Sequence, residues 1–515
     1  MEEGGVLQTI RSPMRIAMDT EEGSNNQVKS EENNHSIDVA IDKDSTDSLE
    51  SETSWFTAKR LLLLFCVINL ITYLDRGAIA STGVNGVPEN CNPNGVCSRG
   101  TGLQGEFNLN NAEDGILSSA FMVGLLLASP IFASLAKSIN PFRLIAVGLS
   151  VWTSAAVGCG FSIGFWTITG CRMLVGVGEA SFISLAAPFI DDNAPVSQRS
   201  AWLGIFYMCI PTGVALGYVY GGLVGDAFGW RHAFFGEAIL MVPFVILCFV
   251  MKPVQLKGFS HDKDVSGSSN EKVTDHKSGN SSGLSNFFHD VNALLHEKIY
   301  VVNVLGYISY NFVIGAYSYW GPKAGYSIYN MSNADMLFGG ITIVGGIVGT
   351  LGGGFVLDHL NSTIPNAFKL LSTATFLGAV FCFSAFCFKD MNVFVVLFLI
   401  GEILVFATQG PVNFVSIHSV KPRLRPLSMA MSTVAIHIFG DVPSSPLVGI
   451  MQDKLENWRK SALILSSVLF LAAGIWFIGV FLGGAVSYDE DDERPESNTE
   501  QSNTTAKMAA ASSEP

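Results

Sequence analysis

The sequence predicts an all-α integral membrane protein with twelve transmembrane helices in two six-helix halves. Three observations predict this class. Hydrophobic residues make up 49% of the 515 residues and charged residues only 14%, and the mean hydropathy is +0.37. The apolar residues gather in long runs, and motifs of the first half of the chain return in the second. Low charge with long apolar runs is typical of a chain that folds in a bilayer.

Twelve runs reach the length of about 20 apolar residues that a helix needs to cross a membrane. They cover about residues 60–85, 113–136, 142–161, 164–188, 200–223, 232–251, 298–320, 335–357, 367–388, 391–416, 427–450 and 461–485. The first six define an N-terminal half, 58–251, and the last six a C-terminal half, 298–485. The polar segment 252–297 links the halves. The tails 1–57 and 486–515 are rich in Ser, Asn, Glu and Asp, which predicts disorder because few apolar side chains can form a core.

The distribution of Lys and Arg predicts the orientation of the spans. More of them fall on the side that holds both tails and the linker, so we expect that side to be cytosolic. No short apolar core led by Lys or Arg precedes the first span, so we expect no cleavable signal peptide. The loop 86–112 is then non-cytosolic, and its Cys91 and Cys97 are either free or joined by a disulfide. Asn330 begins an Asn-Met-Ser glycosylation motif on the same side.

The second half of the chain repeats short motifs of the first. PVSQRSA at 195–201 returns as PRLRPLS at 422–428, and DAFGWRHA at 226–233 returns as DKLENWRKSA at 453–462. The same order at a similar offset indicates a duplicated six-span unit. A parallel repeat of this kind predicts a substrate site between the halves, near the middle of the membrane.

Four charged residues lie inside the apolar runs of the first half. Asp75 and Arg76 belong to a YLDR motif in the first span, while Arg172 and Glu179 lie seven residues apart on one face of the fourth. Depths counted along the two helices are similar, so Asp75 can pair with Arg172, and which of the two arginines it holds stays open. With all four ionised the cluster is neutral, which makes its burial tolerable. Two roles stay open: proton coupling or gating through Glu179, and a static charge lock.

The second half offers fewer charges at mid-depth. His437 in the eleventh span and Glu402 in the tenth are candidate residues of a substrate cavity. Histidine is the side chain type whose charge changes near neutral pH, so His437 suits a proton or headgroup contact, although a lone histidine can also simply hydrogen-bond a neighbouring helix. The sequence contains no phosphate-binding loop, no dinucleotide loop and no Cys/His cluster. We therefore expect no enzyme activity, catalytic residue, cofactor, metal site or nucleic-acid partner.

The motif RMLVGVGEA at 172–180 fits the fourth-span pattern of the major facilitator superfamily. Together with YLDR at 73–76, WRHAFF at 230–235 and IHIFGD at 436–441, it resembles the spinster family of lipid transporters. The segment SLAKSINPFRLI is similar to the plant branch of that family. The resemblance covers about residues 55–485 and implies the major facilitator fold.

The resemblance also implies roles for individual residues. The family's network for proton sensing and alternating access is matched by Asp75, Arg76, Arg172 and Glu179, and a cavity residue is matched by His437. After the second span the chain departs from the superfamily pattern, because Lys137 stands where an Asp is usual. Asp358, at the corresponding place in the second half, keeps the acid. Lys137 and Asp358 are therefore the candidate gating residues.

From the resemblance we expect a monomeric carrier of an amphipathic lipid, either a sphingolipid such as a sphingoid phosphate or a lysophospholipid. Transport would proceed by alternating access, with or without coupling to protons. The expected location is a late-endosomal, lysosomal or vacuolar membrane, with the plasma membrane as the alternative. Two other functions stay open: a carrier of a small polar solute such as an organic acid or a sugar, and a membrane receptor or scaffold that transports nothing.

Overall fold

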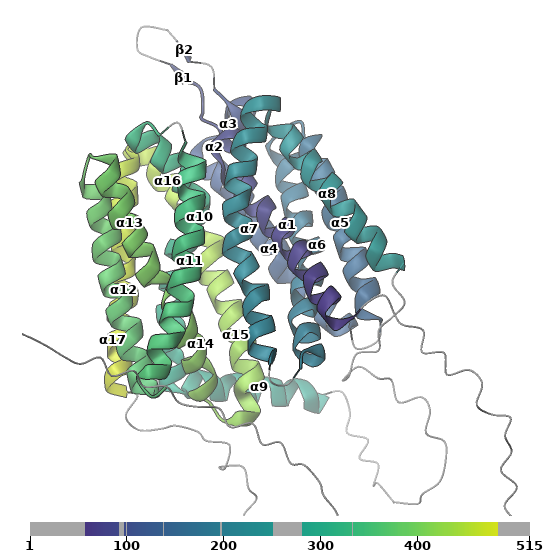
Figure 1. Cartoon of the computed structure of the whole chain (residues 1–515), viewed down its shortest axis with the longest axis vertical. Coiled ribbons are helices and arrows are strands. Elements are labelled where there is room, and N and C mark those ends of the chain that lie inside the picture. The colour runs from purple at the N-terminus through teal and green to yellow at the C-terminus, as the bar shows by residue number, and fades with distance from the viewer. Residues whose placement is uncertain are drawn as a thin grey trace, which may run out of the picture. The chain divides into compact units, whose positions relative to one another are not determined.

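The computed structural model of the chain describes residues 57–91, 97–98, 100–136, 139–195, 198–250, 281–331 and 333–482. Within these residues, twelve helical segments are long and apolar enough to cross a membrane. Apart from one short β-hairpin, the elements between residues 57 and 482 that the structure describes are helical (Figure 1). The predicted all-α membrane fold is confirmed. The candidate gating residue Lys137 lies outside the described residues.

The N-terminal half contains six spans, and the hairpin and two short helices lie between the first two. In chain order its elements are α1 (Ala58–Ala80), α2 (Thr82–Asn85), β1 (Asn90–Cys91), β2 (Cys97–Ser98), α3 (Gly102–Glu106), α4 (Asn111–Leu135), α5 (Pro141–Gly160), α6 (Phe165–Asn193), α7 (Arg199–Phe228) and α8 (Trp230–Val250). We call the end of the bundle with β1, β2, α2 and α3 the hairpin end, and the opposite end, where α9 lies, the α9 end (Figure 1).

The C-terminal half contains the other six spans, two of them in pieces. Its elements are α9 (Ser281–His296), α10 (Lys298–Tyr329), α11 (Ala334–His359), α12 (Ile364–Cys387), α13 (Met391–Phe406), α14 (Gln409–His418), the 3₁₀ turn η2 (Pro422–Leu424), α15 (Arg425–Ile436), the π-helical turn η3 (His437–Asp441), α16 (Val442–Leu455) and α17 (Trp458–Leu482). The tenth span comprises α13 and α14, and the eleventh runs from η2 to α16.

The first span ends earlier than the predicted residue 85. Ser81 adopts an extended backbone conformation with ψ of 154°, so α1 stops at Ala80 and the short helix α2 follows. The Ser81 hydroxyl donates to the carbonyl oxygen of Ala78 and accepts from the backbone N–H of Val84. One serine thus caps both helix ends, which apolar composition alone does not reveal.

The linker between the halves is not entirely a loop. Its last part forms α9, and Leu294 of this helix packs with Tyr300, Val304, Val420 and Leu424. Arg423 pairs with Asp290 of the same helix at 3.1 Å. The C-terminal half therefore anchors α9 through both an apolar and a charged contact.

The internal repeat of the sequence is also visible in the structure. Arg231, at the start of α8, donates to the carbonyl oxygens of Gly160 at 3.0 Å and Ser162 at 2.6 Å, where α5 ends. Arg459, at the start of α17, donates to the carbonyl oxygens of Phe386 at 2.8 Å and Phe388 at 2.5 Å, where α12 ends. Each arginine satisfies carbonyl groups that a helix leaves unpaired at its C-terminus. The two halves use equivalent arginines for equivalent contacts, which supports the duplication.

Two glycines set the position of α6 in the N-terminal half. A Cβ atom on Gly176 would lie 2.0 Å from the carbonyl oxygen of Phe121 in α4, and one on Gly178 would lie 2.5 Å from the backbone nitrogen of Trp152 in α5. Since no side chain separates the backbones, α6 fits closely between α4 and α5. This close packing fixes Arg172 and Glu179, which belong to the same helix.

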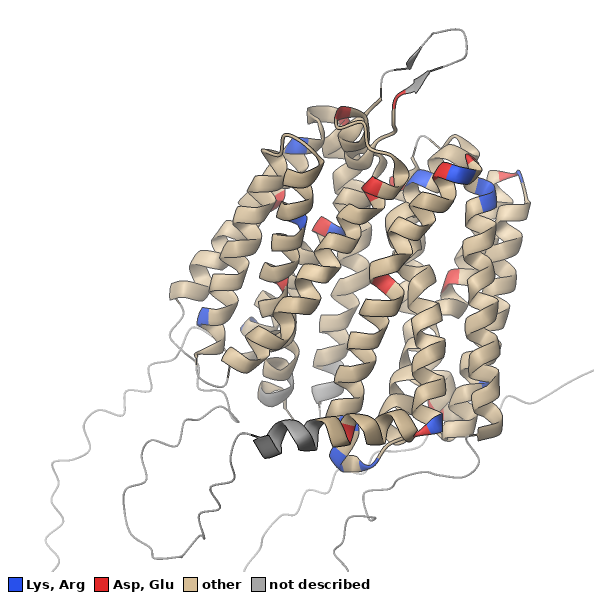
Figure 2. Ribbon diagram, turned by 180° about the vertical axis from the view of Figure 1, so that it is seen from behind, with Lys and Arg blue, Asp and Glu red and all other residues tan. Residues whose placement is uncertain are grey.

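Figure 2 shows that most of the described charged residues lie near the two ends of the helices and few lie between.

Candidate functional site

A cavity of about 280 Å³ lies between the two halves. Its N-terminal wall comes from α1, α4, α6 and α7, and its C-terminal wall from α10, α11, α13 and η3. The charged or titratable residues of its lining are Arg76, Arg172, Glu402, His437, Asp441 and four tyrosines, Tyr73, Tyr218, Tyr317 and Tyr319. Apolar side chains such as Met122, Val214, Phe338 and Phe406 complete the wall. The predicted cavity residues His437 and Glu402 therefore line the same space as the arginines.

The four predicted charges form two ion pairs at the N-terminal wall. Nη1 of Arg172 lies 2.6 Å from Oδ1 of Asp75, so Asp75 pairs with Arg172, as the similar depths allowed. Nη2 of Arg76 lies 2.5 Å from Oε1 of Glu179. The two carboxylates are fully buried, and 17% of the Arg76 side chain is exposed. Both guanidinium groups border the cavity, while their acids lie behind them.

Aromatic rings hold the arginines in place. The Arg76 guanidinium lies 4.4 Å from the ring centre of Tyr73 and 4.6 Å from that of Phe121, and the Arg172 guanidinium lies 5.5 Å from that of Phe121. Because the negative ring face attracts a cation, Phe121 of α4 links the two arginines. The wall thus presents positive charge on a fixed aromatic support.

A fifth ionisable residue belongs to this cluster. Glu237 of α8 has no exposed surface and interacts with Asp75, and neither of its oxygens has a hydrogen-bond donor. Glu237 is not among the candidate residues predicted from the sequence. A signal was present, since Glu237 is an isolated acid in the predicted span 232–251.

The C-terminal wall carries a histidine–aspartate pair on the π-helical turn η3. Nδ1 of His437 lies 2.7 Å from Oδ2 of Asp441. A π turn widens the helix locally, and such turns often occur at functional sites. Asp441 also interacts electrostatically with Arg76 of the opposite half. The sequence suggested His437 as a separate residue, whereas the structure gives it an acidic partner that faces the arginines.

Glu402 of α13 occupies another part of the cavity wall. It lies near Tyr218 of the N-terminal half and Tyr310 and Tyr317 of α10, with which it interacts electrostatically. A Cβ on Gly345 of α11 would lie 3.1 Å from Cβ of Glu402. Glu402 is therefore a partly exposed acid surrounded by tyrosines, placed to contact whatever occupies the cavity.

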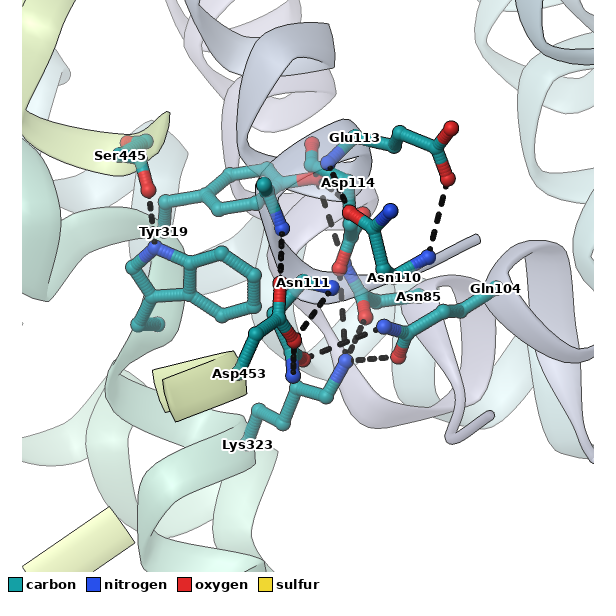
Figure 3. Close-up of polar contacts among 12 residues, drawn as sticks. Asn85, Gln104, Asn110, Asn111, Glu113, Asp114, Tyr319, Lys323, Ser445 and Asp453 are labelled. Carbon is teal, nitrogen blue, oxygen red and sulfur yellow. Dashed lines mark hydrogen bonds and ion pairs between the residues drawn. The ribbon is translucent and has the colours of Figure 1, made fainter. Parts of the chain in front are cut away.

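At the hairpin end, a buried polar cluster around Lys323 joins the two halves (Figure 3). The ammonium group of this α10 residue lies 2.8 Å from Oδ1 of Asn85 and 3.3 Å from Oδ2 of Asp114, and it donates to Gln104. The hydroxyl of Tyr319, also on α10, lies 2.7 Å from Oδ1 of Asp114. One lysine thus binds three elements of the N-terminal half: α2, α3 and α4.

Two aspartates close the same end at helix N-termini. Asp453 of α16 accepts hydrogen bonds from the backbone N–H groups of Asn111 at 3.1 Å and Ala112 at 3.0 Å, at the start of α4 (Figure 3). Asp335 of α11 accepts from the backbone N–H of Thr82 at 2.9 Å and from its hydroxyl at 2.5 Å, at the start of α2. A carboxylate is favourable there because the first N–H groups of a helix lack partners.

Sequence reasoning missed this cluster. Asp114 and Asp335 stand at the first residues of predicted spans, where a charge reads as an ordinary helix end, and Lys323 lies just beyond the predicted seventh span. In the structure α10 continues to Tyr329, so Lys323 becomes a buried helical residue. A lysine next to an apolar run was the available signal.

The remaining candidate residues lie away from the cavity. Asp358 is in the last turn of α11, at the α9 end, and accepts a hydrogen bond from the Ser362 hydroxyl at 3.2 Å. Cys91 and Cys97 face each other in the register of the hairpin, and the disulfide stays a prediction. Asn330 is exposed after α10 with a left-handed backbone, at φ of 51°, and its glycosylation also stays a prediction.

Two six-span halves with a charged cavity between them define a class of protein, the multi-pass helical membrane transporters. A family model described as Major Facilitator Superfamily matches residues 65–440. A solved structure of a bacterial homolog to the human lysosomal transporter spinster, in an inward-facing and unoccupied conformation, has the same fold, with a TM-score of 0.68 and 16% identity. That match covers 84% of this chain and 99% of the bacterial one.

Closer relatives come from Arabidopsis thaliana. The chain is 64% identical over 461 residues to the probable sphingolipid transporter spinster homolog 2. This match covers 90% of this chain and 94% of the relative. It is 63% identical to the probable sphingolipid transporter spinster homolog 3 over 87% of this chain and 89% of the relative. The chain belongs to the spinster family of the Major Facilitator Superfamily, so the resemblance is confirmed. It is a membrane transporter and not an enzyme.

Proposed function

We propose that this protein carries an amphipathic lipid of the sphingolipid class across a membrane by alternating access of its two halves. The named relatives from Arabidopsis support this substrate class. The observation that carries the proposal is the central cavity, which combines arginines with apolar and aromatic side chains. An anionic headgroup suits the arginines Arg76 and Arg172, and an alkyl chain suits the apolar wall.

The size of the cavity supports a stepwise loading of the lipid. Its volume of about 280 Å³ lies near the lower limit of ligand pockets, which is about 300 Å³. It therefore accommodates a headgroup and the first part of a chain. The rest of the chain needs the halves to separate further, which alternating access provides.

The contacts between the halves support a particular conformational state. The Lys323 cluster, Asp453 on α4 and Asp335 on α2 all lie at the hairpin end. If the α9 end is cytosolic, as the Lys and Arg distribution predicts, the structure represents a state closed to the opposite side. We propose that these contacts form the outer gate. Lys137 and Asp358 remain our candidates for gating at the cytosolic end.

We further propose that the cluster of Asp75, Arg76, Arg172 and Glu179 links transport to protons. Oε2 of Glu179 has no hydrogen-bond donor, so only one of its oxygens is stabilised by Arg76. Glu179→Gln should therefore change the pH profile of transport. Wild-type rates with an unchanged pH profile would favour the static charge lock instead.

For its location we propose a late-endosomal, lysosomal or vacuolar membrane, with both tails and the linker in the cytosol. We propose a monomer with the half boundaries 58–251 and 298–485 given above. The tails 1–57 and 486–515 and the linker 252–297 then lie outside the transport unit. Fractionation of tagged protein and protease protection of the tails test the location and the orientation.

The decisive experiment is uptake into liposomes that contain the purified full-length protein, measured across pH. Labelled sphingoid phosphate, lysophospholipid and sugar are compared, with empty liposomes as the control. We expect saturable uptake of the sphingoid phosphate that unlabelled lipid inhibits. Uptake of lysophospholipid alone would change the lipid class, and uptake of sugar alone would indicate a small-solute carrier. A protein without flux for any solute would fit a receptor or scaffold.

A further inference from the structure

The charges buried in the N-terminal half do not balance. Three acids, Asp75, Glu179 and Glu237, are fully buried around only two guanidinium groups. Each arginine is committed to one acid, Arg172 to Asp75 and Arg76 to Glu179. With every acid ionised, one negative charge in the middle of a membrane protein would have no counter-charge. Burying an unpaired charge there costs more free energy than protonating one of the acids, so we expect one of the three to bind a proton.

The unpaired oxygens indicate where this proton lies. Oδ2 of Asp75 has no hydrogen-bond donor, and neither oxygen of Glu237 has one. The two residues interact directly with each other. Two buried carboxylates in contact repel each other, whereas a carboxyl group and a carboxylate share a hydrogen bond. A proton on Glu237 would therefore satisfy Glu237 and Oδ2 of Asp75 together.

The other titratable groups around Glu237 leave it without a cation of its own. Asp75 faces it from α1, Arg172 from α6 and Tyr220 from α7. Arg172 already donates to Asp75, and the Tyr220 hydroxyl donates to the carbonyl oxygen of Ala233 at 2.8 Å. Glu179 differs, because it keeps Arg76 at 2.5 Å. Among these three acids, Glu237 is thus the one without an arginine partner.

We propose that Glu237 and Asp75 form a proton-binding site in which Glu237 holds the proton and donates it in a hydrogen bond to Oδ2 of Asp75. Loss of this proton creates a second carboxylate beside Asp75, which competes for Arg172. The proton on α8 therefore controls the ion pair between α1 and α6, at the wall of the cavity. The use of the site in transport rests on the function proposed above, whereas the presence of the proton does not.

The test is infrared spectroscopy of the full-length protein in liposomes at neutral pH, comparing wild type with Glu237→Gln. Glutamine has the shape of a protonated glutamic acid and no charge, so the variant should fold and its Tm should stay close to that of wild type. The wild-type-minus-variant spectrum should contain the C=O band of a protonated carboxyl group. Glu106→Gln, which changes a half-exposed acid outside the spans, should remove no such band.

Two outcomes would overturn the site. One is a band of an ionised carboxylate in the wild-type-minus-variant spectrum. The other is a Glu237→Gln protein that does not fold, since a neutral mimic must be tolerated if the native residue is neutral. Transport gives a separate readout: Glu237→Gln should lose the pH dependence of lipid uptake. If the protonated band is present but wild-type uptake does not vary with pH, the site stands and the proton-linked function fails.

Discussion

At the scale of single residues, the N-terminal wall depends on the deeply buried ion pair between Arg172 and Asp75. Arg172 is 1% exposed and its partner Asp75 is fully buried. Removing one member of such a pair leaves the other charge buried without compensation, which costs far more than the intact pair contributes. We therefore expect the loss of either partner to destabilise the fold.

Arg172→Leu tests this requirement. It leaves Asp75 without its cation, and we expect a loss of about 3–5 kcal/mol in the free energy of unfolding, the usual cost of breaking a buried pair. Thermal unfolding in detergent measures the loss. Lys389→Ala, at an exposed position of the hairpin end, should stay within about 0.5 kcal/mol of wild type. Equal stability of Arg172→Leu and wild type would show that the pair has no structural role.

A pH effect on stability is expected outside the membrane spans, at Glu106 of α3. Burial acts to raise the pKa of this carboxyl, but the hydrogen bonds from Arg231 and Trp230 outweigh it and hold the pKa below its ordinary value. A lowered pKa means that the pair stabilises the fold above the unfolded-state pKa of about 4.3 and loses its contribution as the pH falls below that value.

The expected size of this effect is small, because the Glu106 side chain is 45% exposed and such pairs contribute at most about 1 kcal/mol. Glu106→Gln should therefore lower Tm slightly at pH near 7, and the difference from wild type should vanish in acid. Calorimetry over a series of pH values measures it. A difference that grows in acid would contradict the assigned sign.

At the scale of elements, close contact between helix backbones determines which charges meet. Arg172 and Glu179 reach their partners on α1 because glycines let α6 lie directly against α4 and α5. In a bilayer the hydrophobic effect does not drive helix association, so small residues at the contact make the packing possible. The geometry of the ion pairs is thus a consequence of the helix packing.

Gly176→Val should disrupt this packing. Its Cβ would lie 2.0 Å from the carbonyl oxygen of Phe121, so α4 and α6 have to move apart, at an expected cost of about 1–3 kcal/mol. Gly170→Val is the matched control on the same helix, because a Cβ there meets nothing within 4 Å. The measurements are folded yield and Tm of both variants. Equal loss in the two would mean that helix propensity, and not packing, is responsible.

At the scale of the whole molecule, the contacts between the halves hold one conformation. Lys323 joins α10 to α2, α3 and α4, and the aspartates Asp453 and Asp335 cap helices of the opposite half. These contacts are polar and therefore reversible, since water can replace each of them when the end opens. A carrier needs such an exchange in every cycle.

Lys323→Met tests the gate, because it keeps the volume of the side chain and removes its charge. In the closed state Asp114 is then buried without its cation, whereas in the open state water can hydrate its carboxylate. The hairpin end should therefore open more often. Electron spin resonance between labels at Phe228 and Lys389, in a background without other labelled cysteines, should show longer distances than in wild type. Lys460→Met, at an exposed lysine of the same end, should leave them unchanged. Unchanged distances in Lys323→Met would exclude this residue from the gate.

The sequence by itself determined the class of fold, the twelve spans and the similar depths of Asp75 and Arg172. These follow from local or periodic properties: the bilayer requires long apolar helices, and depth along two helices is counted from their ends. The arginines that cap α5 and α12 were present as a repeated WR motif. Such features depend on the spacing of residues along the chain, and this spacing can be read directly from the sequence.

Only the tertiary structure decided which charges meet across helices that are distant in the sequence. Glu237 became a neighbour of Asp75, Lys323 a neighbour of Asp114, and Asp441 a cavity residue facing Arg76. The break at Ser81 and the π turn at His437 could not be predicted from the composition of the spans either, because a few backbone hydrogen bonds decide both features. Which face of a helix meets which neighbour depends on packing between helices that are distant in the sequence, so spacing along the chain does not reveal it.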